Sequence, residues 1–395
     1  MQSDLEYAVL QDEQDAKRLS EILSQGFVGE VDAELQYLNR IGLNQIRTMR
    51  RASKLIGGLA MLPMGQWFGG RCVPMTGIAS VSVAPEARGS GAALKLMQQT
   101  LQELHQQGVA LSTLYPATQY LYRQVGYEQG GTFCQRSCST VGLATVIRNK
   151  RPPLPIEPMP LNWQALLPLA QRQAGRHNGL LERHEAIWLR IVEPVSPHRH
   201  FAYCLGEPEA PEGYVIFSQT RTGSNAILKI LDWVVLTPAA AQSLWAFLAM
   251  HQSQIDQVHW QSGAIDLLSL PLSEQLNRIE SLSRWMTRIV CLEPALISRG
   301  YPLALEGELH LEVQDNLLPD NQGPWILSFD KGQGQVSKGG SGDLKLDVRG
   351  LAALYTGMFS PYQLQNMGLL EGSEAALSLA GQAFGGASPW LADFF

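Results

Sequence analysis

The stretch that decides the fold runs from Ser80 to Gly108 and reads SVSVAPEARGSGAALKLMQQTLQELHQQG. Its apolar, β-branched beginning predicts a strand that ends before Pro85, and the apolar spacing of its second half predicts a long amphipathic helix. The loop between them contains Arg88, Gly89 and Gly91. A helix N-terminus presents unpaired N–H groups and a partial positive charge, and glycine lets a ligand approach the backbone closely. The stretch therefore predicts an anion-binding loop, with a plain tight turn as the alternative.

Two familiar nucleotide-binding patterns are absent from this loop. No Gly-Lys-Ser or Gly-Lys-Thr follows it, as a Walker loop would require, and the dinucleotide pattern Gly-x-Gly-x-x-Gly is missing. The loop instead reads RGSGAA, which is Arg-x-x-Gly-x-Ala directly after a strand and before a helix. Neither of the two familiar patterns therefore explains it.

The segments around this loop predict a domain that mixes helices and strands. β-branched residues and glycine punctuation predict three antiparallel strands before the loop, with turns near Ala52 and Gly69. The expected order is strand, helix, helix, three strands, the quoted helix, strand, helix, strand. Apart from the quoted helix, these elements are expected over residues 5–10, 12–25, 33–41, 44–51, 54–70, 71–83, 109–117, 118–126 and 127–139.

Five prolines crowd residues 148–160 and predict a linker, because proline removes backbone donors and favours extended geometry. Residues 1–148 would then form a first domain and residues 149–286 a second. The second domain follows the plan of the first, with DWVVLTPAAAQSLWAFLAMH in the place of the quoted stretch. We interpret it as a degenerate repeat of the same fold, and an unrelated α/β domain is the alternative. Because its glycine-rich loop is missing, the repeat is not expected to hold the same ligand.

Residues 287–395 predict a third domain, a strand-rich sheet followed by short helices. The chain ends in WLADFF, whose last residue is Phe395. Chain ends are usually polar and poorly ordered. This apolar end is therefore expected to be buried or docked.

The composition narrows the class of protein. With 395 residues, 45% hydrophobic and 17% charged residues, the chain is long enough for two or three globular domains. A net charge of −6 gives no general footprint for nucleic acid. Five scattered cysteines favour reduced thiols over a metal site or disulfides, and the N-terminus lacks the pattern of a signal peptide. We therefore expect a cytoplasmic protein with no membrane span and no metal.

Taken together, the RGSGAA loop, the strand ending VSVAP and the strand order resemble the acetyl-CoA-binding motif of the GNAT acetyltransferases. The resemblance implies that the loop amides hold the pyrophosphate of coenzyme A and that the splayed strand before it exposes backbone groups to the pantetheine. Segment LYPATQYLYRQVGYEQ adds contacts just before its helix. The cofactor-binding residues implied in this way are Val81, Ser82, Val83, Arg88, Gly89, Ser90, Gly91, Ala92, Ala93, Leu94, Ala117 and Thr118.

The chain as a whole resembles the Eis-like (enhanced intracellular survival) family of GNAT enzymes. The expected fold class is α+β: a complete N-terminal GNAT fold, a degenerate central GNAT fold, and a C-terminal domain like sterol carrier protein. The resemblance spans nearly the whole chain, and its motifs are specific in the first domain and at the C-terminus. It implies an N-acetyltransferase that uses acetyl-CoA and forms homo-oligomers, up to a hexamer.

In that family the first tyrosine of Tyr-x-x-x-Gly-Tyr is the general acid, and this position falls on Tyr122. A phenol with a pKa near 10 is protonated at neutral pH and can give its proton to a departing thiolate. Core packing is the alternative reading of such a tyrosine, and Tyr115, Tyr120 and Tyr127 lie close by in sequence. No cysteine lies in the motif segment to carry the acyl group, so the amine is expected to attack directly.

The resemblance also assigns a base, the terminal α-carboxylate, which here belongs to Phe395. Its ordinary pKa of about 3.5 makes it a weak base, so a water relay or an electrostatic role toward a cationic amine fits it better. Simple docking of an apolar tail is the alternative, and Asp393 could supply the carboxylate instead.

The amine that accepts the acetyl group is the least defined part of the expected reaction. Eis-like enzymes acetylate aminoglycoside amines and lysine side chains, so an aminoglycoside-like polyamine or a lysine side chain is implied. Glu30, Asp32 and Trp67 are the candidate acceptor-binding residues, and a solvated helix start is the alternative for the two acids. Two rival functions stay open: a module that senses acyl-CoA or binds an apolar ligand, and a scaffold without turnover.

Overall fold

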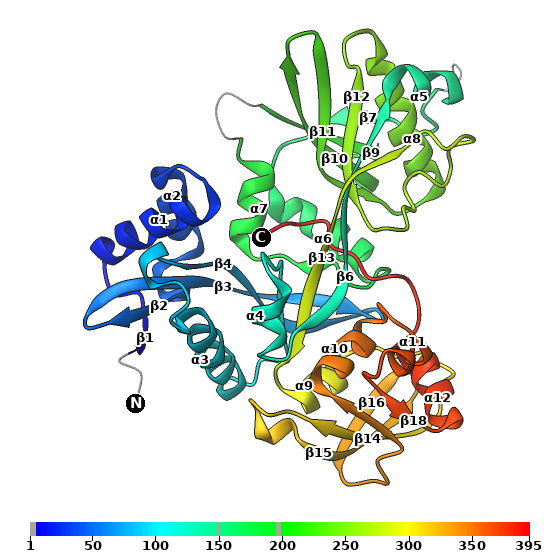
Figure 1. Ribbon diagram of the computed structural model, residues 1–395. Helices are drawn as coiled ribbons and strands as arrows, with labels where there is room; N and C mark the ends of the chain where they lie inside the picture. The colour runs from blue at the N-terminus through cyan, green and yellow to red at the C-terminus, as the bar shows by residue number, and fades with distance from the viewer. Residues whose placement is uncertain (1–4, 148–150, 195–198) are drawn as a thin grey trace. The chain divides into compact units, whose positions relative to one another are not determined.

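The computed structural model describes residues 5–147, 151–194 and 199–395, drawn in Figure 1. The chain divides into two compact units. The first unit holds the chain up to Gly130, then Arg284–Ala387 and Phe395, and the second holds Gly131–Ser283 and Ser388–Phe394. No helix in the described ranges is both long and apolar enough to cross a membrane.

The first unit begins with the predicted order of strands and helices. Strands β1 to β4 form an antiparallel meander, β5 joins β4 in parallel, and β13 joins β5 antiparallel. The predicted turns near Ala52 and Gly69 are confirmed, because both residues have positive φ between paired strands. The elements are β1 (Leu5–Val9), α1 (Glu13–Phe27), α2 (Val31–Ile41), β2 (Ile46–Arg51), β3 (Lys54–Phe68), β4 (Arg71–Val83), α3 (Ala92–Gln106), β5 (Leu111–Leu114), α4 (Gln119–Arg123) and the second half of β13 (Arg278–Ile289), whose residues up to Ser283 belong to the second unit.

Helix α1 shows how local sequence builds this unit. Asp12 caps the helix by accepting a hydrogen bond from the backbone N–H of Asp15 at 2.9 Å. Leu19, Ile22 and Leu23 on one face are buried, and α1 packs against β3 and β4. The 3.6-residue spacing of these apolar residues therefore places α1 on the sheet that carries the quoted stretch.

The rest of the first unit is the predicted strand-rich sheet followed by short helices. Its strand order is β16-β15-β14-β17-β18, and β17 lies parallel to β14 while the other pairs are antiparallel. Its elements are α9 (Leu292–Ser298), β14 (Gly307–Gln314), β15 (Gly323–Asp330), β16 (Gln333–Lys338), β17 (Leu344–Asp347), α10 (Val348–Thr356), α11 (Pro361–Asn366), β18 (Glu371–Gly372) and α12 (Glu374–Phe384).

The second unit repeats the plan of the first. An antiparallel meander of β9, β10 and β11 leads into α8, and β12 then lies parallel to β11, as β5 does to β4. Strand β6 pairs antiparallel with β12, and β7 with β9. Its elements are β6 (Glu128–Ser139), α5 (Thr140–Ile147), β7 (Ile156–Pro158), α6 (Trp163–Ala174), β8 (Leu181–Glu182), α7 (Glu185–Val192), β9 (His200–Glu207), β10 (Ala210–Thr222), β11 (Asn225–Val235), α8 (Pro238–Ala249) and β12 (Gln257–Ser262).

The two predicted domain boundaries can be located in the structure only in part. The boundary between residues 148 and 149 lies outside the described residues. The proline-rich segment after it contains a short strand, β7, which proline tolerates because it lies at a sheet edge. The boundary between residues 286 and 287 falls within β13. Both boundaries stay predictions.

The apolar C-terminus is docked, as expected. Trp390, Leu391 and Phe395 are buried, whereas Phe394 is 53% exposed. In the second unit, Trp390 stacks on Trp233 with ring centroids 6.0 Å apart. The tail is therefore part of the folded structure.

Candidate active site

The quoted strand leaves its neighbour before it ends, which opens a fork in the sheet. β4 and β5 pair from Met75 opposite Leu111 to Ile78 opposite Leu114. β4 then continues to Val83 while β5 stops. At Ser80 the φ is +54° and the register with β3 shifts, which marks a β-bulge. The backbone of Val81 to Val83 therefore faces the fork on the side where β5 has ended.

The loop after this strand forms an open cradle at the start of α3. Gly91 is the N-cap residue with φ +80°, no side chain caps the helix, and Gly89 has φ +74°. A Cβ at either glycine would meet nothing within 4 Å. Arg88 is exposed, with its Nε 3.4 Å from the carbonyl oxygen of Val83. The first-turn N–H groups, the open space and the guanidinium suit a diphosphate.

The four neighbouring tyrosines have different environments. Tyr122 in α4 is buried, which raises the pKa of its phenol to about 12. Tyr127 is fully buried and its hydroxyl is hydrogen-bonded to Ser112 Oγ at 2.7 Å. Tyr120 is 77% exposed, and Tyr115 packs edge-on against Phe395 with centroids 5.7 Å apart. These environments make Tyr122 the best of the four as a proton donor.

Contacts around Tyr122 hold its helix in place. The backbone N–H groups of Val125 and Tyr127 both donate to the Tyr122 carbonyl at 3.1 Å. The rings of Tyr122 and Tyr127 meet edge to face with centroids 6.0 Å apart. Ala117 and Thr118 are exposed just before α4, and Thr118 is its N-cap residue. Both therefore lie on the turn that leads from the end of β5 to Tyr122.

The last residue lies on the sheet of the first unit. A Cβ added to Gly77 of β4 would come within 2.8 Å of the Phe395 ring. The same ring packs against Tyr115, which directly follows β5. Only a glycine at position 77 leaves the ring this space. The chain end therefore lies beside the paired part of β4 and β5, from which the fork opens.

Asp393, the alternative carboxylate, is committed to another contact. In the second unit, Arg183 donates from Nε to both Asp393 oxygens at 3.0 Å and from its two terminal nitrogens to Asp232 at 2.8 Å. Burial raises the pKa of Asp393, and Arg183 opposes that rise. The Asp393 carboxylate therefore helps to hold the tail in the second unit.

The acceptor candidates do not all lie together. Glu30 is at the N-cap position of α2 and Asp32 is in its first turn, and both are exposed. The helix before them reaches β4, because Ser82 Oγ donates to the carbonyl of Ile22 at 3.4 Å. Trp67 lies opposite Cys72, near the turn that joins β3 to β4. The two acids and Trp67 therefore lie toward opposite ends of β4.

One charged cluster beside Tyr122 gave no signal in the sequence. Glu128 is buried and accepts hydrogen bonds from Arg123 of α4 at 2.7 Å and Arg349 of α10 at 2.6 Å. Burial alone would raise the pKa of Glu128, but the two arginines outweigh it and lower the pKa. Arg349 is 221 residues away in sequence, so no local motif could have paired them. The cluster fixes the position of α4.

Comparison with known proteins supports the expected fold class. Acetyltransferase (GNAT) domain models match residues 9–130 and 179–289, and a sterol carrier protein domain model matches residues 292–392. An uncharacterized N-acetyltransferase from Streptomyces avermitilis is 27% identical over 358 residues, which cover 82% of each chain. The three matched segments confirm the expected fold class.

Two solved structures align with nearly the whole chain. A GCN5-related N-acetyltransferase from Anabaena variabilis is 48% identical with a TM-score of 0.95, covering 99% of this chain and all of that one. Eis1 from Mycobacterium abscessus shares the fold, with a TM-score of 0.80, 20% identity, and coverage of 99% of this chain and all of that one.

GNAT domains use acetyl-CoA, and the cradle at Gly89 and Gly91 fits its diphosphate, so acetyl-CoA is the acyl donor. At 48% identity along its whole length to a GCN5-related N-acetyltransferase, the chain belongs to that family, with the Eis-like order of two acetyltransferase domains and a sterol carrier protein domain.

Proposed function

We propose that this N-acetyltransferase acetylates an amine of an aminoglycoside-like polyamine or a lysine side chain, and that the amine attacks the thioester directly. The observation that carries the proposal is the fork between β4 and β5, with the cradle at Gly91 after one strand and Tyr122 after the other. A cationic acceptor suits the exposed carboxylates of Glu30 and Asp32 beside the helix that reaches β4.

The cofactor-binding part of the proposal uses mainly backbone groups. Acetyl-CoA supplies an activated acetyl thioester when it is bound. The loop from Arg88 to Leu94 would hold its diphosphate through first-turn N–H groups and the Arg88 guanidinium. The backbone of Val81 to Val83 would bind the pantetheine, because no strand covers it where β5 has ended. Ala117 and Thr118 would add contacts from the turn before α4.

Tyr122 would act as the general acid. Its pKa of about 12 keeps the phenol protonated at neutral pH, so it can deliver a proton to the leaving sulfur. Among the described residues its hydroxyl has no hydrogen-bond partner, which leaves the proton available. Tyr127, by contrast, has its hydroxyl engaged by Ser112.

The α-carboxylate of Phe395 would receive the amine. The contacts of the Phe395 ring with Gly77 and Tyr115, beside the paired strands from which the fork opens, support this role. The carboxylate would attract the ammonium form and accept its proton, directly or through water. Trp67, with an indole N–H that is buried and has no partner in the described chain, stays a candidate contact for the acceptor.

The test is release of coenzyme A from acetyl-CoA with a panel of amines. Spermidine, kanamycin and a lysine-containing peptide represent the proposed class, and a neutral sugar is the control. We expect at least one amine to accelerate release over the amine-free rate. Binding of coenzyme A without acceleration by any amine would remove the proposed acceptor class and favour an acyl-CoA sensor. Absence of coenzyme A binding would leave only a scaffold.

The role of Phe395 is tested by adding one glycine after it. The extension moves the carboxylate by about one residue length, roughly 3.8 Å between Cα atoms. We expect turnover to be lost while coenzyme A binding stays unchanged, and retained turnover would remove Phe395 from the mechanism. An extended chain that ends in glycine amide has no terminal carboxylate, so it would show whether the displaced carboxylate still contributes.

We also propose a cytoplasmic homo-oligomer, up to a hexamer, as the Eis-like resemblance implies. Sedimentation velocity on the full chain measures the oligomeric state, and a monomer at micromolar concentration would contradict it.

A further inference from the structure

The second unit contains its own fork, in the position that corresponds to the fork at β4 and β5. Parallel strands β11 and β12 pair from Ile227 opposite Gln257 to Lys229 opposite His259. β11 then continues to Val235 and β12 to Ser262. The repeat thus keeps the opening in the sheet that the first domain uses.

This second fork lacks a diphosphate cradle. Helix α8 begins with Pro238, which has no N–H, and its N-cap Thr237 accepts from the N–H of Ala240 at 3.1 Å. Pro238 thus removes one of the N–H groups that a helix start offers, and Thr237 engages another. A ligand of this fork would not be held as a nucleotide is held by the loop before α3.

The C-terminal segment occupies part of the second fork. Trp390 stacks on Trp233 of β11 and lies against Gly263, which directly follows β12. Its backbone N–H donates to the carbonyl of Asn178 at 3.0 Å. The tail thereby closes one end of the opening and leaves a defined hollow beyond it.

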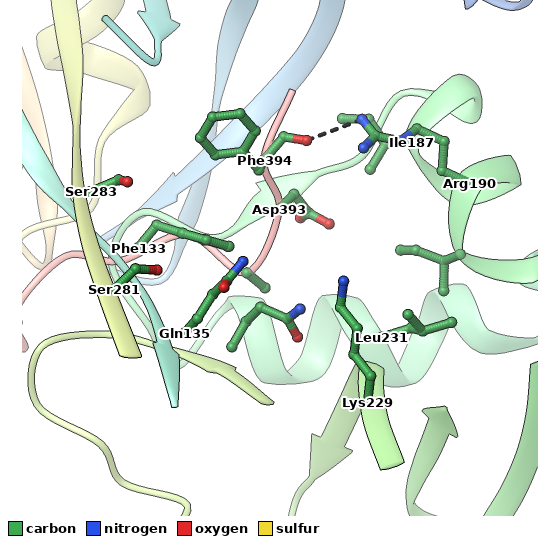
Figure 2. A pocket seen from close by; sticks show the side chains of 13 residues that line it. Phe133, Gln135, Ile187, Arg190, Lys229, Leu231, Ser281, Ser283, Asp393 and Phe394 are labelled. Atoms are coloured by element: carbon green, nitrogen blue, oxygen red, sulfur yellow. Dashed lines mark hydrogen bonds between the residues drawn. The ribbon is translucent and has the colours of Figure 1, made fainter. Parts of the chain in front are cut away.

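That hollow is a cavity of about 390 Å³, shown in Figure 2. Strands β6, β11, β12 and β13, helix α7 and tail residues 392–394 all contribute to its wall. Its size is within the range of small-molecule sites. Ile187, Leu231 and the tilted ring pair of Phe133 and Phe394 supply its apolar surface.

Several polar side chains that line this cavity have no hydrogen-bond partner among the described residues. Among the described residues, the side chains of five lining residues form no hydrogen bond or ion pair: Gln135, Lys229, Gln261, Ser281 and Ser283. Figure 2 shows Gln135, Lys229 and Asp393 around the same hollow. Amides, hydroxyls and an ammonium that face one cavity without partners can all serve a ligand.

The charges around the cavity favour an anion. Lys229 and Arg190 line it, and Arg190 donates to the carbonyl of Phe394 at 3.1 Å. The carboxylate in the wall, Asp393, is held by Arg183 through both oxygens. Arg190 also acts electrostatically on Asp393, so among the described lining residues Lys229 carries the uncommitted charge, which is positive, in contrast to the exposed acids Glu30 and Asp32 of the first unit.

We propose that the second fork binds a small polar molecule that carries a carboxylate or phosphate group, with Lys229 and Arg190 on the anion and the free amides and hydroxyls on its other polar groups. Because residues 392–394 form part of the wall, the bound ligand stabilises the docked tail. By thermodynamic linkage, a change that loosens the tail also weakens binding of the ligand.

Isothermal titration of the full chain tests the site with citrate, glucose 6-phosphate and inorganic phosphate as anionic probes. Glucose and spermidine are the neutral and cationic controls. We expect at least one anionic probe to bind one per chain at millimolar concentration or below, and neither control to bind as tightly. Citrate binding alone identifies a carboxylate site, and binding of the phosphates a phosphate site. If no anionic probe binds, or if spermidine binds more tightly, the proposal is wrong.

Two charge-matched variants assign the binding to this cavity. Lys229→Gln is expected to weaken the anionic probe about tenfold or more, because it removes a charge-assisted contact. Lys345→Gln removes a lysine of β17 that is also exposed, and it is expected to leave binding unchanged. Coenzyme A affinity should be the same in both, which separates this site from the cradle before α3. Equal binding by wild type and Lys229→Gln would overturn the proposal.

The tail linkage has its own measurement. Phe394→Ala removes a half-exposed side chain from the cavity wall. We expect this variant to bind the anionic probe more weakly. In the wild type, we expect the bound probe to slow the removal of Phe395 by carboxypeptidase. A probe that binds fully to Phe394→Ala and leaves digestion unchanged would disprove the linkage.

Discussion

At the scale of single residues, burial and hydrogen-bond partners separate groups that look alike in the sequence. Tyr127 is buried with its hydroxyl bound to Ser112, and Tyr120 is 77% exposed. Tyr122 combines burial with a hydroxyl that has no partner among the described residues. A general acid needs a proton that it can release to the substrate, so this combination distinguishes Tyr122.

Tyr122→Phe removes this proton and little volume. We expect turnover of acetyl-CoA with an accepted amine to fall about 100-fold or more, the usual contribution of a general acid, with coenzyme A affinity unchanged. Steady-state release of coenzyme A measures the first and calorimetry the second. Tyr120→Phe, in the same helix but exposed, is the matched control and should keep full turnover. If Tyr122→Phe loses less than about tenfold, the acid is elsewhere.

At the scale of elements, the two corresponding helices α3 and α8 differ at their N-termini. Gly91 leaves α3 uncapped, with open space around it. At α8, Thr237 accepts the N–H of Ala240 and Pro238 has no N–H, so fewer N–H groups are left for a ligand. The repeat therefore has the same fold without the open glycine loop to which we assign the diphosphate, since the fold depends on buried strands and the loop depends on two glycines.

Gly91→Ala tests the cradle. The new Cβ lies in open space, so the variant should fold, but it strains a residue with φ +80° and crowds the approach of a phosphate. We expect KM for acetyl-CoA to rise about tenfold. Gly108→Ala, at the other end of α3, has φ +72° and equally open space, so it carries the same strain without the cradle. A similar KM in both variants would contradict a role for the loop.

At the scale of the whole molecule, the last residues connect to buried charges far away in sequence. Arg183 holds Asp393 from 210 residues away and also holds Asp232, while Tyr214 donates to Asp232 at 2.7 Å. Arg183 further lies over the Trp188 ring, 4.5 Å from its centroid. One buried guanidinium thus holds Asp393 of the tail within the second unit.

Asp393→Ala should separate tail docking from folding. Arg183 keeps Asp232 as its partner, so no buried charge is left unpaired, and we expect the free energy of unfolding to fall by only about 1–2 kcal/mol. Turnover should fall by more than this small loss of stability would cause, because the tail is released. Urea denaturation and coenzyme A release measure the two effects. Unchanged turnover would show that Arg183 does not hold the chain end for catalysis.

Buried tyrosines make the stability of the protein sensitive to high pH. Burial raises the pKa of Tyr122 to about 12 and raises the pKa values of Tyr127 and Tyr355 further. Unfolded tyrosines lose their protons near pH 10, so the unfolded chain binds fewer protons than the folded one above that pH. We expect the urea midpoint to fall from about pH 10 upward, over roughly pH 10 to 12 for Tyr122. A midpoint that stays constant up to about pH 11 would contradict this.

The sequence predicted local features well because their causes are local. The meander of the first domain followed from β-branched runs with turns near Ala52 and Gly69, and α1 followed from apolar residues at helical spacing. The loop before α3 could be recognised because the strand, glycines and helix are contiguous. The docked tail could be expected because an apolar end such as Trp390 to Phe395 is costly to leave in water.

Only the tertiary structure decided which distant groups meet. No periodicity places the Phe395 ring on Gly77, pairs Glu128 with Arg349, or brings β13 back beside β5. These contacts join residues tens to hundreds of positions apart, and their energies depend on burial that local spacing does not encode. The sequence alone thus determined the fold class and the open glycine loop before α3, while the packed structure decided where the chain end lies and which of the neighbouring tyrosines is buried without a hydroxyl partner among the described residues.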